Sequence, residues 1–138
     1  MARSKFFSIP ELVNPAIIST IGEEACWRLL GKKVLDSLDD IRTAHGYPIG
    51  INGQGRTDCG IRTQNSQTGA PFSRHKLLYE GVTAFDLHSN HLAELRSMLV
   101  RDHAKFNIQR IEAESSTPGW CHIEIAEQLS GELDIFNP

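Results

Sequence analysis

Two segments in which apolar and polar residues alternate, joined by a short polar connection, constrain the fold of this chain most. The segments span residues 106–114 and 120–125, and Ser-Ser-Thr-Pro-Gly at 115–119 connects them. Alternation with a period of two is typical of strands, and Pro and Gly within a short connection are typical of a hairpin loop. The sequence therefore predicts a hairpin of two antiparallel strands.

Helical periodicity precedes the hairpin. Apolar residues recur at intervals of three and four over residues 23–44, which predicts a helix with one side facing the core. These residues are Trp27, Leu30, Val34, Leu38 and Ile41. We expect a kink at Gly31 and an end at Gly46, and Pro48 prevents the helix from resuming. Ser8-Ile9-Pro10-Glu11 has the form of a capping box and predicts a short helix before it.

The middle of the chain alternates between expected strands and loop. Residues 48–51 and 83–88 are predicted strands, and Asn90 is the expected N-cap of a helix that follows the second of them. Glycines begin a segment, residues 52–75, that is expected to be mostly loop. We find no internal repeat, low-complexity tract or linker. Residues 1–138 are therefore expected to form one α+β domain, an antiparallel sheet with flanking helices.

Charge and composition exclude several classes of protein. Fourteen Lys and Arg against seventeen Asp and Glu give a net charge of −3, which argues against a nucleic-acid partner. No apolar run is long enough to span a membrane, and residues 1–10 lack the features of a signal peptide, so we expect a cytoplasmic chain at synthesis. Cys26, Cys59 and Cys121 are odd in number and widely spaced, and we expect them to be reduced and packed. A monomer is expected.

Histidines and carboxylates raise the question of a metal site. Catalytic zinc is bound by imidazole and carboxylate groups with one position left open, but the chain has no HExxH helix, so its ligands would come from separate strands and loops. The candidates are His75, Asp86, His88 and His122. Strand alternation places Cys121 on the face opposite to His122, so the two are not expected to bind one metal. The alternative for each histidine is a structural or solvated residue, and for His88 we prefer the surface interpretation.

Several short motifs, far apart in the chain, together form one spaced pattern. They are Ser73-Arg74-His75, then Gly81, Ala84 and Asp86, and finally Trp120-Cys121-His122. This pattern resembles the Ser-x-His, Gly-x-Ala-x-Asp and Trp-x-His signature of the zinc D-Ala-D-Ala carboxypeptidases, although two residues instead of one separate Gly81 from Ala84. That family shares its fold with the hedgehog signalling domain and includes phage endolysins that cut peptidoglycan stem peptides. Residues 38–42, 46–49 and 60–62 and Asn65 add to the likeness, which is closest to the small phage and prophage branch and covers roughly residues 8–125.

The resemblance implies a hedgehog/D,D-peptidase-like fold and a zinc metallopeptidase that hydrolyses peptidoglycan stem peptides, as a D,D-carboxypeptidase or an endolysin-like endopeptidase. His75, Asp86 and His122 match the zinc ligands of the family. Arg62 matches the arginine that holds a substrate carboxylate or carbonyl oxygen. Without the resemblance, Arg62 could equally form a structural salt bridge. Ser73 would bind the substrate or hold the loop that carries the ligand. Such a protein would reach the cell wall on release during phage lysis.

Two departures from the family pattern affect the site. His75 and Asp86 are 86 − 75 = 11 residues apart, farther than is usual in the family, because residues 76–80 are inserted. The position three residues before His122, where many members carry a catalytic acid, is occupied by Gly119. We expect the insertion either to be absorbed as a loop that leaves both ligands in place or to reshape the mouth of the site. The second departure removes the expected general base.

The general base would then come from another part of the hairpin. Glu112 and Glu114 lie on the strand that the hairpin brings beside His122, and we prefer Glu114 slightly, with Glu124 a weaker candidate. The alternative interpretation of these glutamates is that they are exposed carboxylates on a strand, without a catalytic role. Gly119 also keeps a different function open, a non-catalytic zinc-containing module that binds the cell wall or belongs to a virion. A metal-free scaffold with structural histidines is the third possibility.

Overall fold

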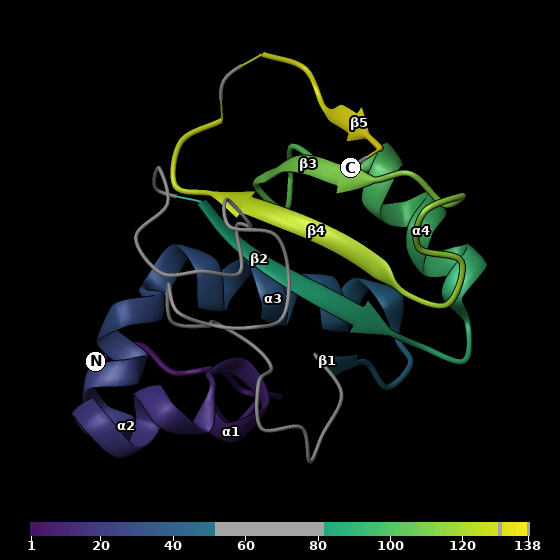
Figure 1. Cartoon of the computed structure of the whole chain (residues 1–138). Coiled ribbons are helices and arrows are strands. Elements are labelled where there is room, and N and C mark those ends of the chain that lie inside the picture. Colours follow the sequence, from purple (N-terminus) through teal and green to yellow (C-terminus); the bar gives the residue numbers. More distant parts are fainter. Residues whose placement is uncertain (52–81, 130, 138) are drawn as a thin grey trace.

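The part of the chain that the structure describes folds into a mixed α/β structure with one five-stranded sheet (Figure 1). The computed structural model describes residues 1–51, 82–129 and 131–137. Along the chain its elements are α1 (Ile9–Leu12), α2 (Pro15–Leu30), α3 (Lys32–His45), β1 (Gly50–Ile51), β2 (Val82–His88), α4 (Leu92–Arg101), β3 (Ile108–Glu112), β4 (Cys121–Ala126) and β5 (Asp134–Phe136).

The first helices begin and end where short-range chemistry directs them. The backbone N–H of Ser8 donates to Glu11 Oε2 at 2.7 Å, so the capping box is confirmed at the start of α1. The single helix expected over residues 23–44 is wrong: the chain forms α2 and α3, separated at Gly31 with φ of 80° and ψ of 159°. Glycine adopts such a positive φ at little cost, so the expected kink becomes a break.

The sheet has the strand order β1-β2-β4-β3-β5. The predicted hairpin is confirmed, because β3 and β4 pair antiparallel with Ile111 opposite Ile123, and β2 pairs antiparallel with the other side of β4. The prediction of a wholly antiparallel sheet is wrong for β5, which pairs parallel with β3. Because β4 ends beside the start of β3, the chain that follows β4 comes alongside β3 in the same direction.

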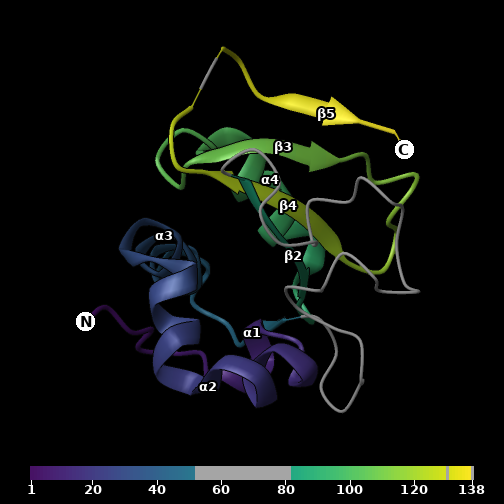
Figure 2. The same cartoon turned by 60° about the vertical axis from the view of Figure 1, so that its left-hand side comes forward.

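One face of the sheet packs against helices. Side chains of the central strands, Phe85 and Ile123 among them, join Leu38 of α3 and Leu95 of α4 in one cluster of buried hydrophobic residues. The positions of α3, α4 and the strands can be followed in Figure 2. Helix α4 begins after His91, so the expected N-cap at Asn90 is one residue too early. Because side chains alternate along a strand, the neighbours of these core residues point to the opposite face.

Cysteine chemistry and membrane insertion can be checked against the structure. Cys26 and Cys121 are free and buried, as expected, and Cys59 lies outside the described residues. In the part of the chain that the structure describes, no helix is both long and apolar enough to cross a membrane.

Candidate functional site

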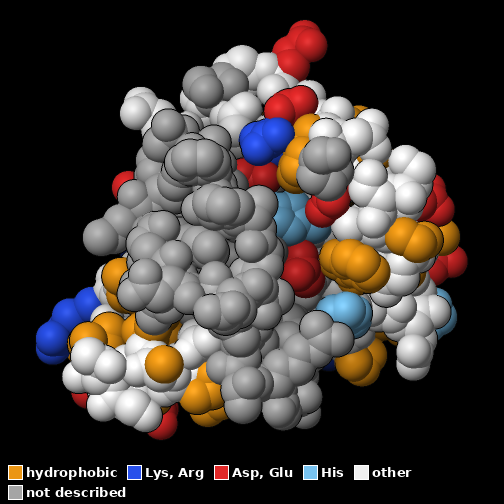
Figure 3. All heavy atoms as spheres, viewed as in Figure 1, with side chains coloured by type: hydrophobic (Ala, Val, Ile, Leu, Met, Phe, Trp, Pro, Cys, Tyr) orange, Lys and Arg blue, Asp and Glu red, His pale blue; other side chains and the backbone are white. Residues whose placement is uncertain are grey.

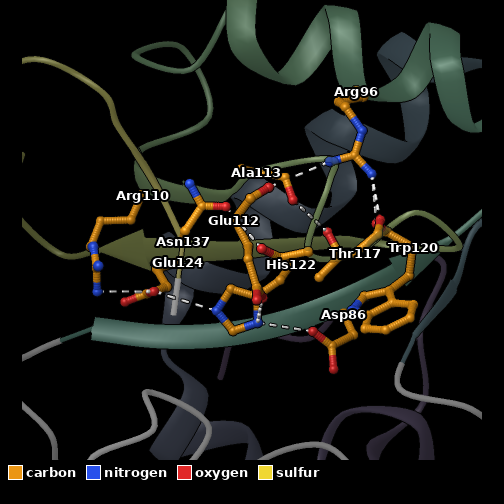
Figure 4. Close-up of polar contacts among 11 residues, drawn as sticks. Asp86, Arg96, Arg110, Glu112, Ala113, Thr117, Trp120, His122, Glu124 and Asn137 are labelled. Carbon is orange, nitrogen blue, oxygen red and sulfur yellow. Dashed lines mark hydrogen bonds and ion pairs between the residues drawn. The ribbon is translucent and has the colours of Figure 1, made fainter.

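Three neighbouring strands bring acidic side chains and a histidine together on the face of the sheet opposite to the core. Asp86 of β2 pairs with His122 of β4, and the β3–β4 register brings Glu112 to the other side of the same histidine. Figure 4 shows the three side chains directed toward one another across the strands. In the space-filling view, a histidine and acidic side chains lie beside hydrophobic and basic ones on this face (Figure 3).

The imidazole of His122 is surrounded by carboxylates. Its Nδ1 lies 2.9 Å from Asp86 Oδ1 and 4.0 Å from Glu112 Oε2, and its Nε2 lies 3.4 Å from Glu124 Oε2. Only 10% of the His122 side chain and 1% of the Glu124 side chain are exposed. Each ring nitrogen therefore faces an acidic group in a site that is largely removed from water.

The carboxylates control the protonation of this cluster. Burial by itself would lower the pKa of His122, but hydrogen bonds to Asp86 and Glu124 and the charges of these groups raise it to about 9. Burial is the main cause that raises the pKa of Glu112, and the charge of Asp86 adds to the effect while His122 opposes it. A carboxyl group with a raised pKa suits proton transfer near neutral pH.

Arg110 of β3 connects the cluster to β5. Its Nη1 lies 3.4 Å from Glu124 Oε2, and its Nε donates to Asp134 Oδ2 at 2.8 Å. The guanidinium therefore has two carboxylate partners, which compensate its charge. It links the deeply buried Glu124 to the edge of the sheet, and this fixes the group that faces His122 Nε2.

Arg96 of α4 holds the connection between β3 and β4 from the side. Its guanidinium donates to the carbonyl oxygens of Trp120 at 2.7 Å, Thr117 at 2.9 Å and Glu112 at 3.4 Å (Figure 4). One side chain thus anchors the last residue of β3 and the connection that leads into β4. The position of Glu112 relative to His122 depends on this anchor, because the two residues flank the connection.

The donor atoms fit a zinc ion in part. Two ligands of a tetrahedral zinc, each about 2.0–2.1 Å from the metal, lie about 3.3 Å apart, whereas Asp86 Oδ1 and His122 Nδ1 are 2.9 Å apart and hydrogen-bond directly to each other. Zinc would have to displace the proton that the raised pKa keeps on His122 near neutral pH. Within residues 1–51, 82–129 and 131–137, no group of three or more potential ligands is arranged to hold a metal. The third expected ligand, His75, lies outside the described residues.

The other expected site residues divide into three groups. Arg62 and Ser73, like His75, lie outside the described residues. His88 is exposed at the end of β2, which agrees with a surface residue. Glu114 does not continue the face of Glu112, because β3 ends at Glu112 and Glu114 is exposed in the following turn.

The charge of Glu114 acts on another side chain of the hairpin, Cys121. Burial raises the pKa of the Cys121 thiol to about 11, and the charge of Glu114 contributes to the rise while Arg96 opposes it. Since Cys121 and His122 are adjacent on one strand, their side chains point to opposite faces. Of Glu112 and Glu114, the two main candidates for the general base, Glu112 is the one whose carboxylate lies beside His122.

Three residues of the site carry no motif that sequence reasoning used. Arg110 could have been found, because alternation places it on the face of Glu112 and the hairpin register places it opposite Glu124. Arg96 interacts through backbone carbonyl groups, which leave no pattern in the sequence. The ring of Phe136 makes an edge-to-face contact with His122, but Phe136 belongs to a three-residue strand that is too short to show alternation.

Comparison with known proteins identifies no relative of this chain. No protein-family model, no curated protein and no solved structure matches the chain.

Proposed function

We propose that the protein is a zinc-dependent peptidase that hydrolyses peptidoglycan stem peptides, as a D,D-carboxypeptidase or an endopeptidase. The observation that carries the proposal is the convergence of Asp86, His122 and Glu112 from three strands on one buried point. The first two match the ligand positions of the family that the sequence resembles, and the third supplies a carboxylate where the family position, Gly119, has none. His75 would complete the ligand set.

The residues of the chain have distinct tasks in this proposal. A bound zinc ion supplies Lewis-acid polarisation of the scissile carbonyl group and makes water more acidic. Glu112 accepts a proton from the attacking water and returns it to the leaving amine, as a general base and then a general acid. Glu124 holds Nε2 of His122, which leaves Nδ1 on the side of Asp86. Arg62 is proposed to hold a substrate carboxylate and so to orient the peptide.

Metal analysis and digestion of muropeptides test the proposal together. The purified full-length chain is expected to contain one zinc per molecule, and mass spectrometry is expected to show loss of D-Ala or cleavage within the stem peptide. Stoichiometric zinc without any cleaved peptide would remove the enzymatic function and leave the metal site standing.

A pair of matched substitutions assigns the base. Glu112→Gln is expected to reduce turnover by about 10²–10⁴-fold with zinc retained, because it removes the proton acceptor and keeps the shape of the side chain. Glu114→Gln is the control on the same connection and is expected to leave turnover unchanged. The reverse result would assign the base to Glu114. If neither substitution changed turnover, both glutamates would be excluded as the general base.

The alternative is a zinc-containing module that binds the cell wall or belongs to a virion and has no catalytic activity. Gly119 favours it, because no acid can act from that position. This alternative predicts that the protein binds zinc and peptide but does not cleave the peptide. It also predicts that neither Glu112→Gln nor Glu114→Gln changes this behaviour. A metal-free scaffold, in which His122 and Asp86 form only a buried ion pair, predicts that a chelator changes neither thermal stability nor activity.

A further inference from the structure

The last described strand, β5, adds a side chain to the candidate site from outside the segment that carries the family resemblance. It pairs parallel with β3, and this register sets Phe136 opposite Glu112 and Asp134 opposite Arg110. The strand is held at both ends: Asp134 Oδ2 accepts from Arg110 at 2.8 Å, and Asn137 Oδ1 accepts from Ser116 Oγ at 2.9 Å. The backbone N–H of Ala113 also donates to the carbonyl of Phe136 at 2.8 Å.

The ring of Phe136 is fixed between two groups of the site. Its centroid lies 5.7 Å from that of His122 with an angle of 80° between the planes, an edge-to-face contact. Arg110 Cζ lies 3.8 Å from the centroid of the same ring. Phe136 is half-buried, so part of the ring is still available to a bound molecule beside His122.

The chemistry of this wall defines the group that fits it. Arg110 has Glu124 and Asp134 as partners, so it offers no uncompensated charge to an anion at this position. Phe136 contributes an apolar surface next to the proposed reacting groups, Glu112 and His122. A small aliphatic side chain of the substrate would cover this surface and exclude water, whereas a hydrogen atom in its place would leave the ring exposed.

We propose that Phe136 is a specificity-determining residue that contacts the methyl side chain of an alanine next to the scissile bond. This proposal rests on the proposed peptidase function and names one feature of its substrate. Discrimination by a single methyl or methylene group in an apolar site amounts to about 10–200-fold. A preference for alanine over glycine of about tenfold is therefore expected in the unmodified protein.

The test compares Phe136→Ala with Ile135→Ala in the zinc-loaded full chain. Ile135 is the matched control, because it lies on the same strand, is 56% exposed and points to the opposite face. The substrates are acyl-D-Ala-D-Ala and acyl-Gly-D-Ala peptides. Phe136→Ala is expected to reduce kcat/KM for the first peptide about tenfold, mainly through KM, and to abolish the preference over the second. Ile135→Ala is expected to keep both values within about twofold, and Phe136→Leu is expected to retain most of the preference.

Separate outcomes decide between this inference and the proposed function. An unchanged preference for alanine over glycine in Phe136→Ala overturns the inference. An equal loss of kcat/KM with both peptides, or a loss of zinc affinity, also overturns it, because either result shows that Phe136 acts through His122 or through the fold. If the unmodified protein cleaves neither peptide, the hydrolytic function fails, and the same comparison is made with peptide dissociation constants. If the unmodified protein binds the D-Ala peptide more tightly than the Gly peptide and Phe136→Ala removes this difference, the inference is supported. If the two peptides bind equally, or if the difference remains in Phe136→Ala, the inference is overturned.

Discussion

Removal of the Arg96 side chain gives the strongest test of how the site is held. In Arg96→Ala the carbonyl groups of Thr117 and Trp120 lose donors at 2.9 and 2.7 Å, and that of Glu112 loses a weaker one at 3.4 Å. Hydrogen bonds from a charged donor contribute about 1.5–3 kcal/mol each. The two shorter bonds at the lower value, with nothing added for the third, amount to about 3 kcal/mol.

The assay is urea unfolding followed by tryptophan fluorescence and far-UV circular dichroism. With a slope of about 1.5 kcal/mol/M for a chain of this size, a loss of about 3 kcal/mol lowers the midpoint by about 2 M. Amide hydrogen exchange should also increase in β3 and β4, because Arg96 anchors both sides of their connection. Arg96→Lys keeps the charge without the planar set of donors and is expected to recover part of the loss.

Arg101→Ala is the matched control for this prediction. Arg101 lies in the last turn of the same helix, its side chain is 69% exposed, and its partner is the adjacent Asp102. We expect no measurable change of the midpoint. Equal shifts for Arg96→Ala and Arg101→Ala would refute the reasoning, because they would show that the carbonyl contacts do not contribute to stability.

Three further predictions concern metal affinity, pH and the core. Glu124→Ala is expected to weaken zinc binding about 10–100-fold in competition with a chelator, because His122 loses the carboxylate that orients it. The pKa of His45 is lowered by burial and by the charge of His91, so the unfolded chain binds its proton more tightly; stability is full above pH of about 6.5 and falls below it. Denaturant titrations should show a shallower acid-side decrease for His45→Gln. Phe85→Ala should cost about 3–5 kcal/mol in the same titration, since the side chain is fully buried.

Local patterns in the sequence determined the elements that depend on neighbouring residues. The capping box at Ser8, the hairpin of β3 and β4, and the end of α3 at Gly46 follow from short-range chemistry and side-chain alternation, and the structure confirms them. Alternation by itself also assigns Cys121 and His122 to opposite faces of the sheet. These features could be predicted because the residues responsible are close together in the sequence, within one turn, one strand or one hairpin.

Only the tertiary structure decided how these elements come together. The pairing of Asp86 with His122 depends on the register between strands that are far apart in the sequence, and alternation leaves that register open. The choice of Glu112 over Glu114 depends on where β3 ends, and Phe136 enters the site because β5 returns parallel to β3. Contacts between distant segments, and backbone carbonyl groups held by Arg96, are set by packing of the whole chain, and for this reason they have no signature in the local sequence.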